Sequence, residues 1–246
     1  MSDFVAAPLA VVDSARPVAA AWIGDWLLTF ETSGAALPSR VPGSGWRLEQ
    51  SGPGWQSWLT APGPGWRGAP TLTVETATGS VRLIGELFGT ADPAAIIADV
   101  AAGRASPNTL NGHFLLVAHH RPVDEWHIWT NRHATFHAYL ATNGSRVAVG
   151  TFMPAVAAAV GRDELDWEGL TGFFGFGFFA GDRTHLKGVR ILRPATHYRF
   201  SGHGQLLGEA CYWRWQHEPD YSRSYDATVD EFAARFGVVM DDLTAD

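Results

Sequence analysis

Residues 110–141 have the sequence LNGHFLLVAHHRPVDEWHIWTNRHATFHAYLA, and this stretch decides the fold class. Two runs rich in β-forming residues, Leu110–His119 and Trp126–Asn131, lie on either side of a turn at residues 121–124. Directly downstream, Asn143-Gly144 separates two further β-forming runs, and this dipeptide is a strong hairpin signal. The stretch therefore predicts antiparallel strands joined by tight turns.

Similar signals on both sides predict the remaining elements. Residues 71–88 indicate a hairpin, because TLTVET and VRLIGELF flank the turn sequence ATGS. Residues 92–102 predict a short helix with Asp92 as the N-cap and Pro93 at the first helical position. Further strands are expected at 18–32, 138–141, 146–150, 189–193 and 197–200, and further helices at 154–160 and 166–174.

Two later segments are strongly apolar. The aromatic run at residues 173–179 is expected to be a buried passage from a helix into a loop. From Asp226 onward, apolar residues fall at the spacing of one helical face. They are Val229, Phe232, Ala233, Phe236, Val239, Met240 and Leu243. Such a face needs a partner, so we expect the helix either to fold back on the domain or to adjoin a second domain.

The composition excludes several classes of protein. With 246 residues, 46% of them hydrophobic, the chain can bury the core of one large domain. A net charge of −7 argues against binding to nucleic acid or to an acidic membrane, which requires a basic patch. The apolar run Gly172–Ala180 is too short to cross a bilayer, and Phe4–Val12 lacks the basic residues of a secretory signal. A cytoplasmic location is therefore expected.

The cysteine and histidine residues do not predict a metal site. Cys211 is the only cysteine, which excludes an internal disulfide, and we expect it to be inertly packed. His119 and His120 are adjacent on a predicted strand, so their side chains should point to opposite faces. The other histidines lack metal-ligand spacing, and no metal is expected.

Five short motifs occur in the same order as in a known family. They are Asn111-Gly112-His113-Phe114, Arg132-His133, Ala138-Tyr139, Gly181–Arg190 with Pro194, and Tyr212-Trp213. This series resembles the back half of the glutaminase domain of asparagine synthetases, which are class II glutamine amidotransferases. β-Lactam synthetases and lasso-peptide cyclases belong to the same group and also dispense with the catalytic cysteine. The resemblance implies an α+β fold: a four-layer αββα sandwich of two mostly antiparallel sheets, as in the N-terminal-nucleophile (Ntn) hydrolases.

The resemblance also indicates what the chain lacks for glutaminase chemistry. The family uses a cysteine at the start of the chain as nucleophile, with its α-amine as base. This chain begins Met1-Ser2, so Ser2 is the candidate nucleophile, but the expected leader separates it from the first strand. Near the start of that strand, Ile23-Gly24 resembles the family's Cys-Gly-Ile opening and carries neither thiol nor hydroxyl.

The glutamine pocket is similarly altered. The family has Asn-Gly-Glu at the end of a strand, and the matching residues here are Ile84, Gly85 and Glu86. Gly85 and Glu86 remain as candidate substrate-binding residues, whereas an isoleucine offers no hydrogen bond to a developing oxyanion. The aspartate that holds the glutamine amine has no counterpart. Arg40 and Arg47 are candidates, by order alone, for the arginine that holds the carboxylate.

The expected organisation has three parts: a leader at 1–17, a glutaminase-like domain at 18–215, and a linker with an amphipathic helix at 216–246. That helix would lead toward a synthetase domain that this sequence does not contain. The chain has no Ser-Gly-Gly-x-Asp-Ser loop, so no cofactor is expected here. ATP and Mg²⁺ would belong only to a synthetase partner, joined in cis or in trans.

Three hypotheses follow. The first is a degenerate, glutaminase-inactive domain of an asparagine-synthetase-like, ATP-dependent amide-forming protein, which scaffolds the adenylating domain or binds a peptide or amino-acid substrate. The second is a stand-alone, non-enzymatic binding module on the same fold. The third is an active glutamine hydrolase that uses Ser2. The final helix also offers a surface for a homodimer.

Overall fold

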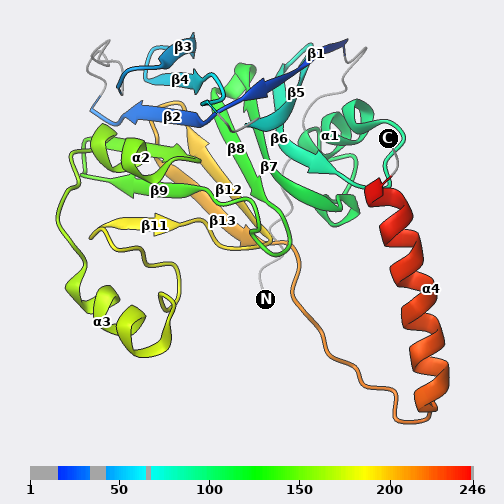
Figure 1. Ribbon diagram of the computed structural model, residues 1–246. Helices are drawn as coiled ribbons and strands as arrows, with labels where there is room; N and C mark the ends of the chain where they lie inside the picture. Colours follow the sequence, from blue (N-terminus) through cyan, green and yellow to red (C-terminus); the bar gives the residue numbers. More distant parts are fainter. Residues whose placement is uncertain (1–15, 34–42, 65–67, 245–246) are drawn as a thin grey trace.

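The structure, a computed structural model, describes residues 16–33, 43–64 and 68–244 (Figure 1). Within these residues, thirteen β-strands form two antiparallel sheets, accompanied by four α-helices. The α+β class and the two antiparallel sheets predicted from the sequence are confirmed. The expected leader falls outside the described residues except for Arg16 and Pro17, which begin the first strand.

The larger sheet has seven strands in the order β1-β5-β6-β7-β8-β12-β13. Their bounds are Arg16–Ile23, Ala69–Thr76, Gly79–Leu87, Gly112–His120, Glu125–Thr130, Thr196–Ser201 and Leu206–Cys211. As the sequence predicted, β5 and β6 form a hairpin, in which Thr76 pairs with Gly79 around the turn residues Ala77 and Thr78. The sequence did not predict β13, which forms one edge of this sheet.

The smaller sheet has six strands in the order β11-β9-β10-β2-β4-β3. Their bounds are Val189–Ile191, Tyr139–Thr142, Arg146–Gly150, Trp26–Glu31, Trp55–Thr60 and Trp46–Ser51. In the turn between β9 and β10, Asn143 Oδ1 accepts hydrogen bonds from the amides of Ser145 and Arg146. The predicted hairpin at Asn143-Gly144 is thus confirmed, together with the side-chain interaction that fixes its turn.

Three hydrophobic clusters define the layers of the molecule. The largest lies between the two sheets and includes Trp26, Ile84 and Phe200. The second packs α1 (Pro93–Ala101) against the outer face of the larger sheet, and Asp92 caps this helix as predicted. The third packs α2 (Met153–Ala159) against the outer face of the smaller sheet. The layer order is therefore helix, sheet, sheet, helix.

The segment 18–32 differs from the single strand or hairpin arm that its composition suggested. It contains parts of two strands, β1 and β2, which belong to different sheets. The chain crosses between the sheets at Gly24 and Asp25. A side chain at Gly24 would clash with the Thr60 hydroxyl and the Ala61 carbonyl group, so the crossing requires glycine. Local β-propensity does not indicate which sheet a strand joins, and this explains the difference.

The aromatic run at 173–179 is not buried, so that expectation is wrong. Its first four residues form the end of α3 (Trp167–Phe176), and Gly177 then caps this helix in the left-handed conformation. Phe174 is 79% exposed and Phe176 72% exposed. Figure 1 shows α3 lying beyond β11, away from the layers of the sandwich. The run therefore forms an apolar surface and not part of the core.

The predicted C-terminal helix is present as α4 (Tyr225–Thr244). Every described side chain on it is exposed except that of Glu231, which is half-buried. Figure 1 shows α4 beside the sandwich, at the end of the extended segment that follows β13. The helix thus does not fold back onto the domain. Across the described residues, none of the helices has the length and apolar character required to pass through a membrane.

Candidate functional site

The residues assigned to glutamine chemistry by resemblance are only partly described. Ser2 and Arg40 lie outside the described residues. Arg47 lies on β3, at the edge of the smaller sheet, with an exposed side chain. Residues 84–86 lie at the end of β6 in the larger sheet. The structure therefore does not bring Arg47 into a common cleft with residues 84–86.

The strand opening where the family has its nucleophile is filled by apolar side chains. Ile23 is 3% exposed and Ile84 is 1% exposed. Both belong to the cluster between the sheets, together with Leu115 on β7. Ile84 pairs directly with Leu115 across the β6–β7 ladder. Ile23 and Ile84 are therefore part of the hydrophobic core, and neither lines an open cleft.

The backbone amides at the sheet crossing already have partners. Gly24 N donates to Thr60 O at 2.8 Å, and Asp25 N donates to Thr60 Oγ1 at 2.7 Å. Trp26 N donates to Thr151 Oγ1 at 2.9 Å. Burial raises the pKa of Asp25, and a hydrogen bond from the Thr151 hydroxyl opposes that shift. None of these three amides is available to stabilise an oxyanion, so the cluster fixes the crossing.

Gly85 and Glu86 have structural explanations. Gly85 has a φ of +104°, and a side chain there would clash with the His113 carbonyl oxygen on β7. The close approach of β6 and β7 therefore requires glycine at this position. Glu86 is exposed, and its carboxylate has no partner among the described residues. Of the two candidate substrate-binding residues, only Glu86 presents a functional group.

Three of the five motifs that carried the resemblance, 111–114, 132–133 and 212–213, meet with the segment after Pro194 at one end of the larger sheet, around Thr130 and Asn131. Asn131 Nδ2 donates to Gly112 O at 3.0 Å, and Ala195 N donates to Asn131 O at 3.0 Å. The Tyr212 hydroxyl donates to the Thr130 carbonyl, although these residues are 82 positions apart in the sequence. Segments 111–114, 131–133, 194–196 and 212–213 are thus tied together at this strand-end junction.

The strand-end junction also contains two buried polar atoms without a described partner, Asn131 Oδ1 and Arg132 Nε. The Arg132 guanidinium lies 5.9 Å from the centre of the Trp213 ring, and His133 meets the same ring edge-on at 5.4 Å. Burial raises the pKa of Tyr212 well above its usual value. Since the Thr130 and Tyr212 hydroxyls both donate to backbone carbonyls, the junction positions strands and offers no activated nucleophile.

A histidine pair that the sequence did not reveal, with His127 buried and His197 half-buried, lies on the outer face of the larger sheet. His127 Nδ1 and His197 Nε2 are 3.1 Å apart, and the His197 ring stacks on Trp129 at 4.3 Å. Burial, together with the nearby Arg199 guanidinium, lowers the pKa of His127 to about 4. Burial and the neighbouring His127 lower the pKa of His197 to about 3. The sequence could not indicate this pair because the two residues are 70 positions apart.

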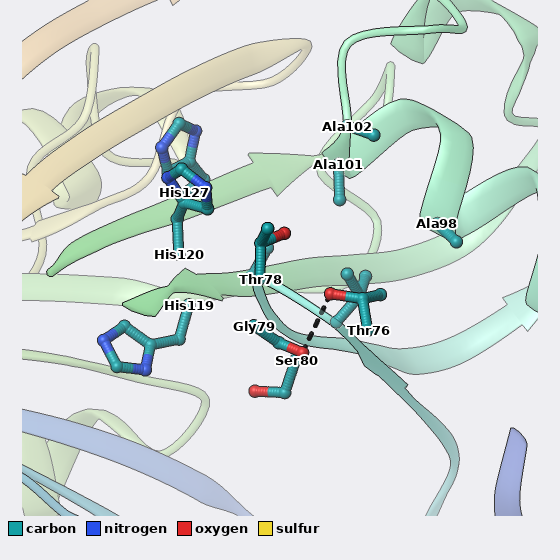
Figure 2. Close-up of a pocket in the computed structure, with 12 residues that line it drawn as sticks. Thr76, Thr78, Gly79, Ser80, Ala98, Ala101, Ala102, His119, His120 and His127 are labelled. Atoms are coloured by element: carbon teal, nitrogen blue, oxygen red, sulfur yellow. Dashed lines mark hydrogen bonds between the residues drawn. The ribbon is translucent and has the colours of Figure 1, made fainter. Parts of the chain in front are cut away.

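Figure 2 shows a small pocket beside this pair. His120 and His127 point to one side of the sheet and His119 to the other, which confirms the alternation expected for His119 and His120. The pocket has a volume of about 20 Å³. It has room for about one water molecule, so it is too small for a substrate.

A much larger cavity, of about 660 Å³, lies between the edges of the two sheets. Its walls come from β9, β10 and β11 of the smaller sheet and from Phe200 and Leu206 of the larger sheet. Charged residues around α3, in the segment before β11 and on β11 complete it, among them Asp182 and Arg190. Sequence reasoning missed this cavity because its walls come from segments that are distant in the chain.

The described residues contain no group of three or more His, Cys, Asp or Glu side chains placed to hold a metal ion. The expectation that Cys211 is inertly packed is wrong. This residue lies on the edge strand β13, where its side chain is exposed and its thiol donates to Trp213 O at 3.0 Å.

Comparison with known proteins gives only distant structural likenesses. No protein-family model matches the sequence, and no curated protein matches it. Among solved structures, the chain is similar to a glutamine phosphoribosylpyrophosphate amidotransferase from B. subtilis, complexed with ADP and GMP. The TM-score is 0.35 with 9% sequence identity, over 78% of this chain. The match covers 44% of the amidotransferase chain, so this chain spans less than half of that enzyme's length.

Proposed function

We propose that this chain is a degenerate glutamine amidotransferase-like domain with the Ntn-hydrolase fold and without glutaminase activity. The helix-sheet-sheet-helix layering supports the fold. The meeting of three of the five resemblance motifs at the strand-end junction supports the relationship, because motifs shared by chance have no reason to converge in space.

The observation that carries the proposal concerns the end of the sandwich at residues 23–26 and 84–86, where the resemblance would put the glutaminase site. Ile23 and Ile84 are buried in the core, and the amides of residues 24–26 all donate within the protein. A glutaminase needs an accessible nucleophile beside free hydrogen-bond donors, and removal of one such donor costs about 3 kcal/mol of transition-state stabilisation. This end of the sandwich supplies neither among its described residues.

The role we propose is to scaffold an adenylating synthetase domain, in cis or in trans, with the linker and helix of residues 216–246 leading toward it. The exposed apolar faces of α3 and α4 support a protein partner, because large unpaired apolar surfaces mark interaction sites. ATP and Mg²⁺ would be bound by that partner. The same surfaces would serve a homodimer if no synthetase domain is present.

The test of inactivity is release of ammonia from glutamine by the purified chain and by its Ser2→Ala variant. We expect both proteins to match the buffer background. Turnover that disappears in the Ser2→Ala variant would establish the third hypothesis, an active hydrolase. Turnover that persists in the variant would also refute the proposed inactivity, and it would indicate a nucleophile other than Ser2.

A second candidate function is a stand-alone binding module. The cavity of about 660 Å³ favours it, because this volume lies within the range of small-molecule sites. A pull-down with the adenylating domain of a synthetase separates the two roles. Stable association supports the scaffold, and ligand binding without association supports the module.

A further inference from the structure

The large cavity has the features of a ligand site at a place that the proposed function does not use. Its lining does not include residues 23–26 or 84–86, so a ligand here would not occupy the former glutamine end. It opens between the sheets, where β11 and β13 form their edges. The inference therefore goes beyond the proposed function.

The charges around the cavity balance. Three acidic residues and three basic residues line it: Asp166, Glu168, Asp182, Arg183, Lys187 and Arg190. Three negative and three positive charges give a net charge of zero. This balance disfavours a polyanion such as a nucleotide and a polycation, and it suits a zwitterion.

Most of these charged groups are already held by hydrogen bonds. Arg183 Nη2 lies 2.9 Å from Glu168 Oε2, and Lys187 Nζ lies 2.8 Å from Glu164 Oε1. Asp166 accepts a hydrogen bond from Gly169 N as the N-cap of α3. These residues are therefore occupied in shaping the rim.

Arg190 and Asp182 are different. Arg190 Nη1 lies 3.7 Å from Asp182 Oδ2, and Arg190 Nη2 lies 3.6 Å from Glu209 Oε2. Asp182 Oδ2 also lies 3.4 Å from Arg193 Nη2. At these distances, and with no hydrogen bond to another described residue, both side chains retain unfilled hydrogen-bonding capacity. Their side chains are only 33% and 26% exposed, so the cost of leaving this capacity unfilled is greater than at the surface. A cation and an anion are thus available side by side in one cavity.

The wall beside this pair is apolar. Leu140 and Val147 come from the smaller sheet, and Phe200 and Leu206 come from the larger sheet. Leu206 is 42% exposed and the other three are buried, so Leu206 provides the apolar surface that is open to a ligand. A side chain that covered Leu206 would gain about 25 cal/mol for each Å² of apolar surface removed from water.

We propose that this cavity binds an α-amino acid with an apolar side chain. The ligand carboxylate pairs with the Arg190 guanidinium, and the ligand ammonium pairs with the Asp182 carboxylate. The apolar side chain packs against Leu206. An arginine fork suits a carboxylate because it donates two parallel hydrogen bonds.

Isothermal titration calorimetry with L-phenylalanine tests the ligand class. We expect binding with a Kd below about 1 mM. 3-Phenylpropionate lacks the ammonium and 2-phenylethylamine lacks the carboxylate, so each should bind at least about tenfold more weakly. L-Glutamine, which lacks an apolar side chain, should also bind more weakly. Absence of phenylalanine binding up to about 10 mM, or equal binding of all four compounds, overturns the proposal.

Variants test the site itself. Arg190→Gln and Asp182→Asn should each weaken phenylalanine binding at least about tenfold. Leu206→Trp fills the cavity without removing a charge, and it should abolish binding. Arg104→Gln removes an exposed arginine that pairs with Asp99 beside α1, and it should bind like the wild type. Melting curves confirm that each variant is folded. Wild-type affinity in folded Arg190→Gln and Leu206→Trp variants contradicts the proposal. The assay of ammonia release from glutamine tests the proposed function separately, because it does not depend on this cavity.

Discussion

At the residue scale, the core position of Ile84 supports the proposal that this end of the sandwich has no glutamine pocket. Its side chain is 1% exposed and lies between the two sheets. Ile84→Asn should therefore destabilise the protein by about 2–4 kcal/mol, because the amide would be buried without a partner. Urea denaturation measures this loss, and Ile84→Val, with a cost of about 1 kcal/mol, is the matched control. Unchanged stability in Ile84→Asn, or a gain of ammonia release, would contradict the assignment of Ile84 to the core.

Asn131 is the residue on which the strand-end junction depends. Its side chain donates to Gly112 O and to Thr135 Oγ1, and only 2% of the residue is exposed. Asn131→Leu preserves the approximate volume but leaves the Gly112 carbonyl unpaired, so we expect a loss of about 1–3 kcal/mol. Urea denaturation measures it. The exposed Asn108→Ala variant should stay within about 0.5 kcal/mol of the wild type. Equal midpoints for Asn131→Leu and Asn108→Ala would show that the junction contributes no stability.

Single residues were predictable from the sequence where their role is local. Asp92 caps α1 through its own neighbours, and Asn143 shapes its own turn. Asn131 is different because its partners lie on another strand and loop, and short-range patterns carry no information on such contacts. The exposure of Cys211 was missed for a related reason, since it depends on β13 being an edge strand.

At the element scale, pairing of β8 with β12 places His127 beside His197 and makes stability depend on pH. Burial holds the pKa of His127 at about 4 and that of His197 at about 3. Both values lie below the ordinary histidine pKa of about 6.5, so the unfolded chain binds more protons between these limits. The stabilisation is complete above about pH 6.5 and is lost as the pH falls toward 4.

Urea midpoints at about pH 7.5 and about pH 5 measure this dependence. The wild type should lose stability at the lower pH, and the double variant His127→Gln, His197→Gln should lose less. His217→Gln removes an exposed histidine of the linker and should keep the full wild-type dependence. A wild-type midpoint that does not change with pH would refute this account of the pair.

Elements were predictable where one hairpin or one helical period defines them. The hairpin β5–β6 and the helix α4 both have strong local patterns. β13 lacks such a pattern, because its sequence LLGEAC does not alternate, and it is stabilised by pairing with β12. β1 and β2 were merged because the crossing at Gly24 depends on the Thr60 side chain of a distant strand.

At the scale of the whole molecule, the sequence indicated the class of fold but not the position of its cavity. The two antiparallel sheets follow from many hairpin signals that agree with one another. The cavity forms where the edges β11 and β13 diverge, and neither edge position can be inferred without the strand order. The candidate glutamine residues were found by resemblance, and the packing of residues 84–86 required the structure.

The molecule consists of a sandwich that carries its own core and a helix, α4, that contributes nothing to that core. The described α4 side chains are exposed or, at Glu231, half-buried, so removing the helix should not uncover the sandwich. A chain that ends at Trp215 should melt within about 2 °C of the full chain. A chain that ends at Gln205 also loses β13 and the Tyr212 hydrogen bond, so it should melt at a much lower temperature.

A fall of more than about 5 °C in the chain ending at Trp215 would mean that α4 packs on the sandwich in solution. In that case, its apolar face would not be free for the partner domain that we propose.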